Sequence, residues 1–119
     1  MAQSIPPALQ DDIRRFDNLR QQQETLTTYK QTIQNELVEL RATLEELRKQ
    51  PEDVVTYKSV GQVMFRVEKP KIVEELDDRE KTLQMKLEST NSQIEKLTKK
   101  LSDLEAKIKI EIAKREPKL

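Results

Sequence analysis

The chain has 119 residues, of which 22 are basic and 22 acidic, and it contains no histidine and no cysteine. Only 34% of the residues are apolar and 37% are charged, and a compact globule of this length needs more apolar residues for its core. Zero net charge removes the electrostatic reason to expect a nucleic-acid partner. Without histidine, cysteine or a second glycine, the usual catalytic dyads, zinc sites and phosphate-binding loops are excluded. We therefore expect no enzyme activity, no metal and no other cofactor.

The sequence also carries no membrane signal. No apolar run approaches the length of a membrane-spanning helix, and no basic amphipathic stretch suits an anionic membrane surface. The first residues lack the basic region and apolar core of a secretory signal. We therefore expect a cytoplasmic protein without a membrane partner.

The first predicted helix covers about residues 7–49. Ser4 can cap it, and Pro7 suits a first turn, where amide hydrogens have no helical partner. Apolar residues then recur at alternating steps of three and four, which is the heptad signature of a coiled coil, until Pro51 blocks the helix. The positions of this seam are Phe16, Leu19, Gln23, Leu26, Lys30, Ile33, Leu37, Leu40, Leu44 and Leu47.

The segment of about residues 54–68 has a different period. Val63, Phe65 and Val67 alternate with other residues, as in a half-buried strand, and residues 54–59 are rich in β-branched and aromatic side chains. Val60 and Gly61 form a candidate turn, because Gly61 is the only glycine of the chain and glycine readily adopts a positive φ. The segment therefore predicts one β-hairpin.

The second predicted helix covers about residues 70–115 and repeats the heptad spacing. Its seam mirrors the first one: the numbers of Leu44 and Leu76 add up to 120, as do those of Leu37 and Leu83. A constant sum is what two antiparallel helices require, so the sequence predicts a mainly α fold in a single domain of residues 1–119. In this fold a long antiparallel two-helix coiled coil is joined by one β-hairpin. The seam of the second helix is formed by Val73, Leu76, Glu80, Leu83, Leu87, Thr90, Ile94, Leu97, Leu101, Leu104 and Ile108.

Polar residues interrupt this seam at a few layers. Glu80 faces Leu40, Gln23 faces Leu97, and Lys30 faces Thr90 when the seams are paired. We attribute these layers to register control or to long side chains that reach out to water, in preference to a binding role.

The hairpin segment predicts an oligomer. A lone two-stranded hairpin is marginal in water and leaves strand edges unpaired, while both helices are committed to the coiled coil. We expect hairpins of several subunits to assemble, with the coiled coils as projecting arms. The alternative, in which the hairpin caps the end of its own helices, remains open. The residues expected to form the assembly surface are Val55, Tyr57, Val60, Val63, Phe65 and Val67.

The free ends of the two helices form a second candidate surface. Ile108, Ile110 and Ile112 cannot all face one seam, because residues two apart on a helix do not share a face. Exposed apolar residues often mark binding surfaces, although fraying with ordinary terminal packing is the competing interpretation. Several arms held together would strengthen weak contacts through avidity. The residues expected to bind a partner are Leu9, Ile13, Ile108, Ile110 and Ile112.

The order of helix, short β segment and helix resembles prefoldin, the hexameric chaperone of archaea and eukaryotes. The sharpest likeness is residues 55–61, Val-Thr-Tyr-Lys-Ser-Val-Gly. This stretch is similar to the beta-class sequence Val-Tyr-Lys-x-Val-Gly, with Thr56 between Val55 and Tyr57. The segment has room for one hairpin, as in beta-class subunits, and the opening Ile5-Pro6-Pro7 looks archaeal.

The resemblance implies a specific function. Two alpha-class and four beta-class subunits would join their hairpins into an intersubunit β-barrel, and the coiled-coil tips would hold unfolded polypeptide without ATP and deliver it to a group II chaperonin. The hairpin residues named above would then serve assembly, and those at the free helix ends would bind the client. The alternative function is a structural coiled-coil adaptor or scaffold without holdase activity.

Overall fold

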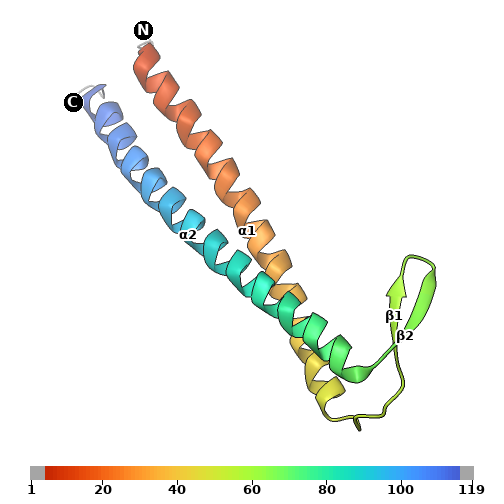
Figure 1. Ribbon diagram of the computed structural model, residues 1–119. Helices are drawn as coiled ribbons and strands as arrows, with labels where there is room; N and C mark the ends of the chain where they lie inside the picture. The colour runs from red at the N-terminus through yellow and green to blue at the C-terminus, as the bar shows by residue number, and fades with distance from the viewer. Residues whose placement is uncertain (1–4, 116–119) are drawn as a thin grey trace. The chain divides into compact units, whose positions relative to one another are not determined.

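The computed structural model describes residues 5–115 and contains two long helices joined by a two-stranded antiparallel sheet (Figure 1). Helix α1 is Pro7–Arg48, strand β1 is Thr56–Val60, strand β2 is Val63–Val67, and helix α2 is Lys69–Arg115. The mainly α fold with one hairpin is confirmed. Ser4, the predicted helix cap, lies outside the described residues.

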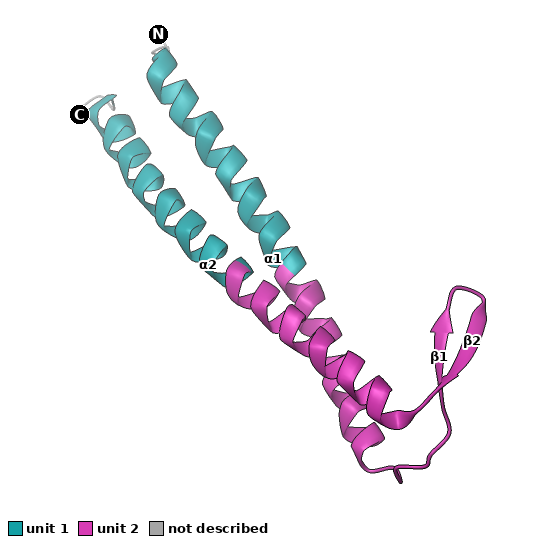
Figure 2. Cartoon of the chain, in the orientation of Figure 1, with its two compact units in different colours: residues 1–29, 90–119 teal, residues 30–89 magenta. Residues whose placement is uncertain are grey.

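The chain divides into two compact units, which are described separately (Figure 2). Unit 1 comprises residues 1–29 and 90–119, and unit 2 comprises residues 30–89 with the hairpin. Each helix contributes a segment to both units. The prediction of a single domain over residues 1–119 stays a prediction.

The best-packed core of the described chain lies in unit 2. Leu44 of α1 and Leu83 of α2 are its most deeply buried side chains, each 1% exposed. These leucines occupy predicted seam positions of opposite helices, so the heptad pattern identified the buried face correctly. The cluster is completed by Ile33, Leu37 and Leu40, with Val73, Leu76 and Leu87 packed against it.

Ion pairs flank this core and hold the two helices of unit 2 in register. Glu80, the polar residue of the seam opposite Leu40, pairs with Arg41 at 3.3 Å between Oε2 and Nε. The predicted explanation of this polar layer therefore applies, because the long carboxylate side chain reaches out of the seam to a partner. The other cross-helix pairs are Arg79 with Glu36 at 2.8 Å and Arg48 with Asp77 at 2.7 Å.

In unit 1 the α1 and α2 segments also pack through their seam residues. Gln23, which interrupts the seam, donates a hydrogen bond from Nε2 to Thr98 Oγ1 at 2.9 Å. The numbers of these two residues add up to about 120, as an antiparallel pair requires. The amide of Gln23 thus finds a polar partner on the opposite helix instead of being buried alone. The buried residues of this seam are Leu9, Thr90, Leu97, Leu101 and Leu104.

The hairpin turn is one residue later than predicted. β1 includes Val60, and Gly61 and Gln62 form the two-residue connection to β2. Gly61 has a φ of 59°, and no other described residue has a positive φ. A positive φ at the first central position only is the pattern of a type II′ turn, which matches the twist of a two-stranded hairpin.

The strands are also shorter than the predicted segment 54–68. Val54 donates its amide hydrogen to the Pro51 carbonyl at 3.1 Å, so residues 51–54 form a turn before β1. At the other end, the Glu68 carbonyl accepts hydrogen bonds from the amides of Lys71 and Ile72. Glu68 therefore begins the first turn of α2 instead of extending β2.

Candidate assembly and binding surfaces

The strand register sorts the predicted assembly residues onto two faces of the hairpin. Val60 is paired with Val63, and Lys58 with Phe65, and paired residues of antiparallel strands share a face. Val60, Val63, Phe65 and Val67 therefore lie on one face, which we call the valine face. Tyr57, paired with Arg66, lies on the opposite face, and Val55 precedes β1.

Both faces of the hairpin are exposed in this chain. Val60, Val63 and Phe65 are each slightly more than half exposed, and so is Tyr57 on the opposite face. If the hairpin capped the end of its own helices, these helices would cover its apolar side chains. The described helices do not cover them. Both strands also have one unpaired edge, because the sheet of the described residues has two strands only.

Met64 is an assembly candidate that the sequence analysis missed. It pairs with Ser59 on the face of Tyr57 and is 66% exposed, more than any residue of the valine face. Strict alternation around Phe65 placed Met64 among the residues outside the apolar face. An unbranched thioether side chain adapts readily to irregular apolar contacts, so the presence of methionine between Val63 and Phe65 was the available signal.

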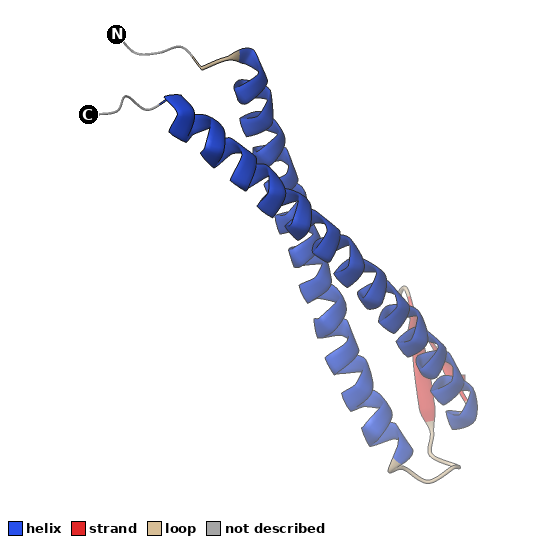
Figure 3. Cartoon of the chain, turned by 90° about the vertical axis from the view of Figure 1, so that its left-hand side faces the viewer, coloured by secondary structure: helices blue, strands red, loops and turns tan. Residues whose placement is uncertain are grey.

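The hairpin, whose strands are red in Figure 3, is tied to α2 of unit 2 by an ion pair. Lys58 Nζ of β1 lies 2.9 Å from Glu75 Oε2 of α2. Inside the hairpin, Thr56 Oγ1 donates a hydrogen bond to the Val67 carbonyl at the open end of the strands. An ion pair thus connects the hairpin to α2, and it leaves the apolar side chains of the hairpin free.

Lys69, the first residue of α2, closes the base of the hairpin. Its side chain is only 7% exposed, and Nζ donates a hydrogen bond to the Gln50 carbonyl at 2.6 Å. This carbonyl lies just past the end of α1, where carbonyls lack helical partners and a lysine is favourable. A second contact reaches Glu52 at 3.4 Å, whose side chain is 80% exposed. No sequence signal marked Lys69, because its burial depends on the two helix ends meeting.

The second candidate surface lies in unit 1, at the helix ends. Leu9 is 4% exposed and packs in the seam, whereas Ile110 and Ile112 are 56% and 43% exposed. Ile13 and Ile108 are half-buried. The expectation that neighbouring isoleucines point in different directions agrees with this pattern. In the chain alone, the exposed apolar surface at the helix ends comes mostly from Ile5, Ile110 and Ile112, while Leu9 is buried between the helices.

A charged residue occupies the seam near these isoleucines. Asp12 is only 17% exposed in its side chain, and its Oδ2 lies 3.2 Å from Lys107 Nζ of α2. Asp12 lies four residues before Phe16, and Leu9 lies three residues before Asp12. The heptad spacing of the sequence therefore already indicated that Asp12 is a seam position. The carboxylate replaces an apolar contact here, and the seam close to the helix ends is held partly by an ion pair.

The part of the chain that the structure describes contains neither a metal-binding cluster nor a membrane-spanning helix. Among residues 5–115, no three histidine, cysteine, aspartate or glutamate side chains gather in a way that would hold a metal ion. No helix within these residues has the length and apolar character needed to cross a bilayer.

Comparisons with known proteins agree with this architecture. The family model described as "Prefoldin subunit" matches residues 10–115. The prefoldin subunit beta of Thermococcus gammatolerans is 40% identical over 106 residues, which cover 89% of this chain and 91% of that protein. This chain belongs to the prefoldin family. Its relatives are subunits of a molecular chaperone.

Further relatives point to the beta class of prefoldin. The prefoldin subunit beta of Saccharolobus islandicus is 36% identical over 117 residues, covering 98% of this chain and 93% of that protein. The crystal structure of the prefoldin beta subunit from Thermococcus strain KS-1 matches with a TM-score of 0.84 at 35% identity, covering 98% of this chain and 100% of that one. The beta-class resemblance drawn from residues 55–61 is therefore confirmed.

Proposed function

We propose that this chain is an ATP-independent holdase subunit that captures unfolded polypeptides at the free ends of its helices. The observation that carries the proposal is the exposure of Ile110 and Ile112 in a member of a chaperone-subunit family. An unfolded chain exposes apolar side chains, and burying apolar surface contributes roughly 25 cal/mol per Å². Each isoleucine thus offers a weak, non-directional contact that suits many clients.

The hairpin would assemble the subunits. Its two exposed faces and unpaired strand edges favour pairing with hairpins of other subunits, because such pairing satisfies backbone groups and covers apolar side chains together. We propose assembly with an alpha-class prefoldin subunit, in a complex of two alpha and four beta chains around an intersubunit β-barrel. Several arms then act on one client, and avidity strengthens contacts that are weak singly.

The client would leave by transfer to a group II chaperonin. The described residues of this chain offer no phosphate-binding loop, since Gly61 is the single glycine and sits in the hairpin turn. Release is therefore expected to follow from competition by the chaperonin, with no nucleotide bound to this subunit. We expect this activity in the cytoplasm.

The holdase is tested by aggregation of a denatured protein in the presence of the assembled complex. The variant I108S/I110S/I112S is expected to suppress aggregation less well than the unchanged protein while keeping its assembly state. The matched control is V38S/M85S, which removes two exposed apolar side chains from the same helices away from their free ends. Equal suppression by all three proteins would contradict the assignment of the client surface.

Size-exclusion chromatography with light scattering separates the chaperone from the adaptor alternative. We expect this chain and an alpha-class subunit to form a complex of six chains, and V63K/F65K to prevent it by placing charges on the valine face. The control is M85K, which places a lysine at an exposed position on α2, away from the hairpin. A stable monomer or a simple dimer in the presence of the alpha-class subunit would favour the adaptor.

A further inference from the structure

The flank of the coiled coil in unit 1 has an unusual charge pattern. The seven positions of a heptad are labelled a to g, and the seam residues occupy positions a and d. In an antiparallel coiled coil, the g residue of one helix, which immediately precedes an a residue, lies opposite a g residue of the other helix. In unit 2 such a pair is Glu36 and Arg79, which attract each other at 2.8 Å. The equivalent residues in unit 1 are Arg15 and Lys100, which are both basic. Like charges placed opposite each other destabilise the pairing, so this flank is not optimised for holding the helices together.

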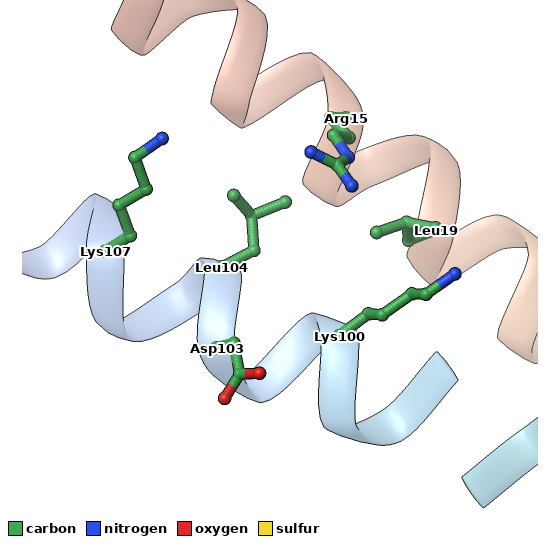
Figure 4. Close-up of a pocket in the computed structure, with 6 residues that line it drawn as sticks. All are labelled: Arg15, Leu19, Lys100, Asp103, Leu104 and Lys107. Atoms are coloured by element: carbon green, nitrogen blue, oxygen red, sulfur yellow. The ribbon is translucent and has the colours of Figure 1, made fainter. Parts of the chain in front are cut away.

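Figure 4 shows that these two cations border a groove between the helix segments of unit 1. The groove has a volume of about 250 Å³, and Leu19 and Leu104 contribute its apolar surface. Lys107 lies one heptad beyond Lys100 and adds a third cation. Asp103 also borders the groove, but its carboxylate points away from α1. The groove therefore combines an apolar floor with basic side chains.

Two of the three cations have no ion-pair partner among residues 5–115. Lys107 pairs with Asp12 at 3.2 Å, whereas neither Arg15 nor Lys100 forms an ion pair with any of residues 5–115. Unpaired cations beside an apolar floor are complementary to a ligand that has both acidic and apolar groups. A phosphate backbone would supply the charge but would leave the exposed part of Leu19 without an apolar contact.

We propose that this groove binds acidic, leucine-rich segments of unfolded polypeptides, and that this subunit therefore prefers such segments to neutral ones. The inference rests on the proposed holdase function and names a client class for it. Charge complementarity identifies the occupant: carboxylates of the segment pair with Arg15 and Lys100, and its aliphatic side chains contact the half-buried Leu19 beside the buried Leu104. The groove extends the client surface from the exposed isoleucines along the flank of the same unit.

The length of the groove along α2 defines a suitable probe. Its lining residues on α2 run from Lys100 to Lys107, a stretch of about 10.5 Å at 1.5 Å per residue. An extended peptide advances about 3.3 Å per residue, so a core of four residues spans a similar length. A fluorescent peptide with the core Glu-Leu-Leu-Glu meets this requirement, and the same peptide with Gln-Leu-Leu-Gln is its neutral counterpart.

The test measures binding of both peptides to the full-length protein by fluorescence anisotropy. The variant R15Q/K100Q is expected to bind the acidic peptide about three- to tenfold more weakly, since two exposed charge pairs are lost, and to bind the neutral peptide as before. The control R14Q/K99Q removes the same charges from the neighbouring outward positions of the same helices, both exposed, and should change neither affinity. Raising the salt concentration should weaken acidic-peptide binding to the unchanged protein and to R14Q/K99Q, and should affect binding to R15Q/K100Q much less.

The results that overturn the proposal differ from those that overturn the holdase. Equal binding of the acidic and neutral peptides, or equal effects of R15Q/K100Q and R14Q/K99Q, would refute the groove assignment even if aggregation is suppressed. Displacement of the peptide by a short single-stranded RNA at lower concentration would assign the groove to nucleic acid instead. A changed assembly state of R15Q/K100Q by light scattering would assign it to contact between subunits. Failure of the unchanged complex to suppress any aggregation would refute the holdase, while the peptide titration still tests the groove.

Discussion

Replacing Lys69 by methionine tests whether a single buried cation secures the base of the hairpin. The Lys69 ammonium donates to the Gln50 carbonyl at 2.6 Å from a side chain that is 7% exposed. A hydrogen bond to a charged group contributes about 1.5–3 kcal/mol. Methionine keeps the length and apolar stem of lysine but leaves this carbonyl, at the end of α1, without its donor. Removing the buried charge also removes its desolvation cost, so the net decrease in the free energy of unfolding should be about 1–2 kcal/mol.

The ion pair to Glu52 is expected to matter much less. Glu52 is 80% exposed and its Oε1 lies 3.4 Å from Lys69 Nζ, and exposed ion pairs contribute about 0–1 kcal/mol. The free energy of unfolding of the variant E52Q should therefore be less than about 0.5 kcal/mol below that of the unchanged protein. If E52Q lost as much stability as K69M, the ion pair and not the carbonyl hydrogen bond would be the important contact.

The assay is urea denaturation of the full-length protein followed by helical circular dichroism. All variants must be compared at one protein concentration, because oligomers gain apparent stability by mass action. The variant K71M is the matched control, since Lys71 is exposed two residues further along the same helix, and it should stay within about 0.5 kcal/mol of the unchanged protein. Equal stability of K69M and K71M would refute the reasoning.

Three further predictions concern the core, the turn and the helix register. The variant L44A removes a side chain that is 1% exposed and should lower the free energy of unfolding by about 2–5 kcal/mol in the same urea assay. The control V38A, at a 69%-exposed site, should lower it by less than about 0.5 kcal/mol. Similar losses in both variants would show that the core is elsewhere. Gly61→Ala should destabilise the hairpin by about 1–2 kcal/mol because its φ is 59°, with no steric clash nearby; unchanged thermal unfolding and assembly would contradict this. A double-mutant cycle on Glu36 and Arg79 should give a coupling of about 0.2–1 kcal/mol that falls with salt, and zero coupling at low salt would show that this pair does not help to set the register.

Most of the two seams could be predicted from the sequence because a heptad pattern is a local property. Leu37, Leu44 and Leu83 stand at regular steps, and the spacing alone indicates which face of each helix is buried. The antiparallel pairing followed from matching the two seams in reverse order. Pairs such as Arg41 with Glu80 were not identified beforehand, because a long side chain has several partners within reach.

The hairpin was predictable in kind but less so in detail. Apolar alternation indicated Val63, Phe65 and Val67 as one face, and the only glycine indicated the turn. The turn nevertheless starts at Gly61 and not at Val60, and this register put Tyr57 and Met64 together on the opposite face. A one-residue change in a turn reassigns the partners of every strand residue, which is why periodicity alone did not settle the two faces.

The sequence by itself determined that two helices pair in reverse order around a narrow apolar seam and enclose a β segment, since these features repeat at short range. Only the tertiary structure decided which long-range neighbours each polar side chain has. It buried Lys69 against the end of α1 and paired the seam residue Asp12 with Lys107. It also placed Arg15 and Lys100 beside two leucines, without an ion-pair partner among the described residues. The physical reason is that burial and charge pairing depend on residues that lie far apart in the chain and come together only when the helices pack.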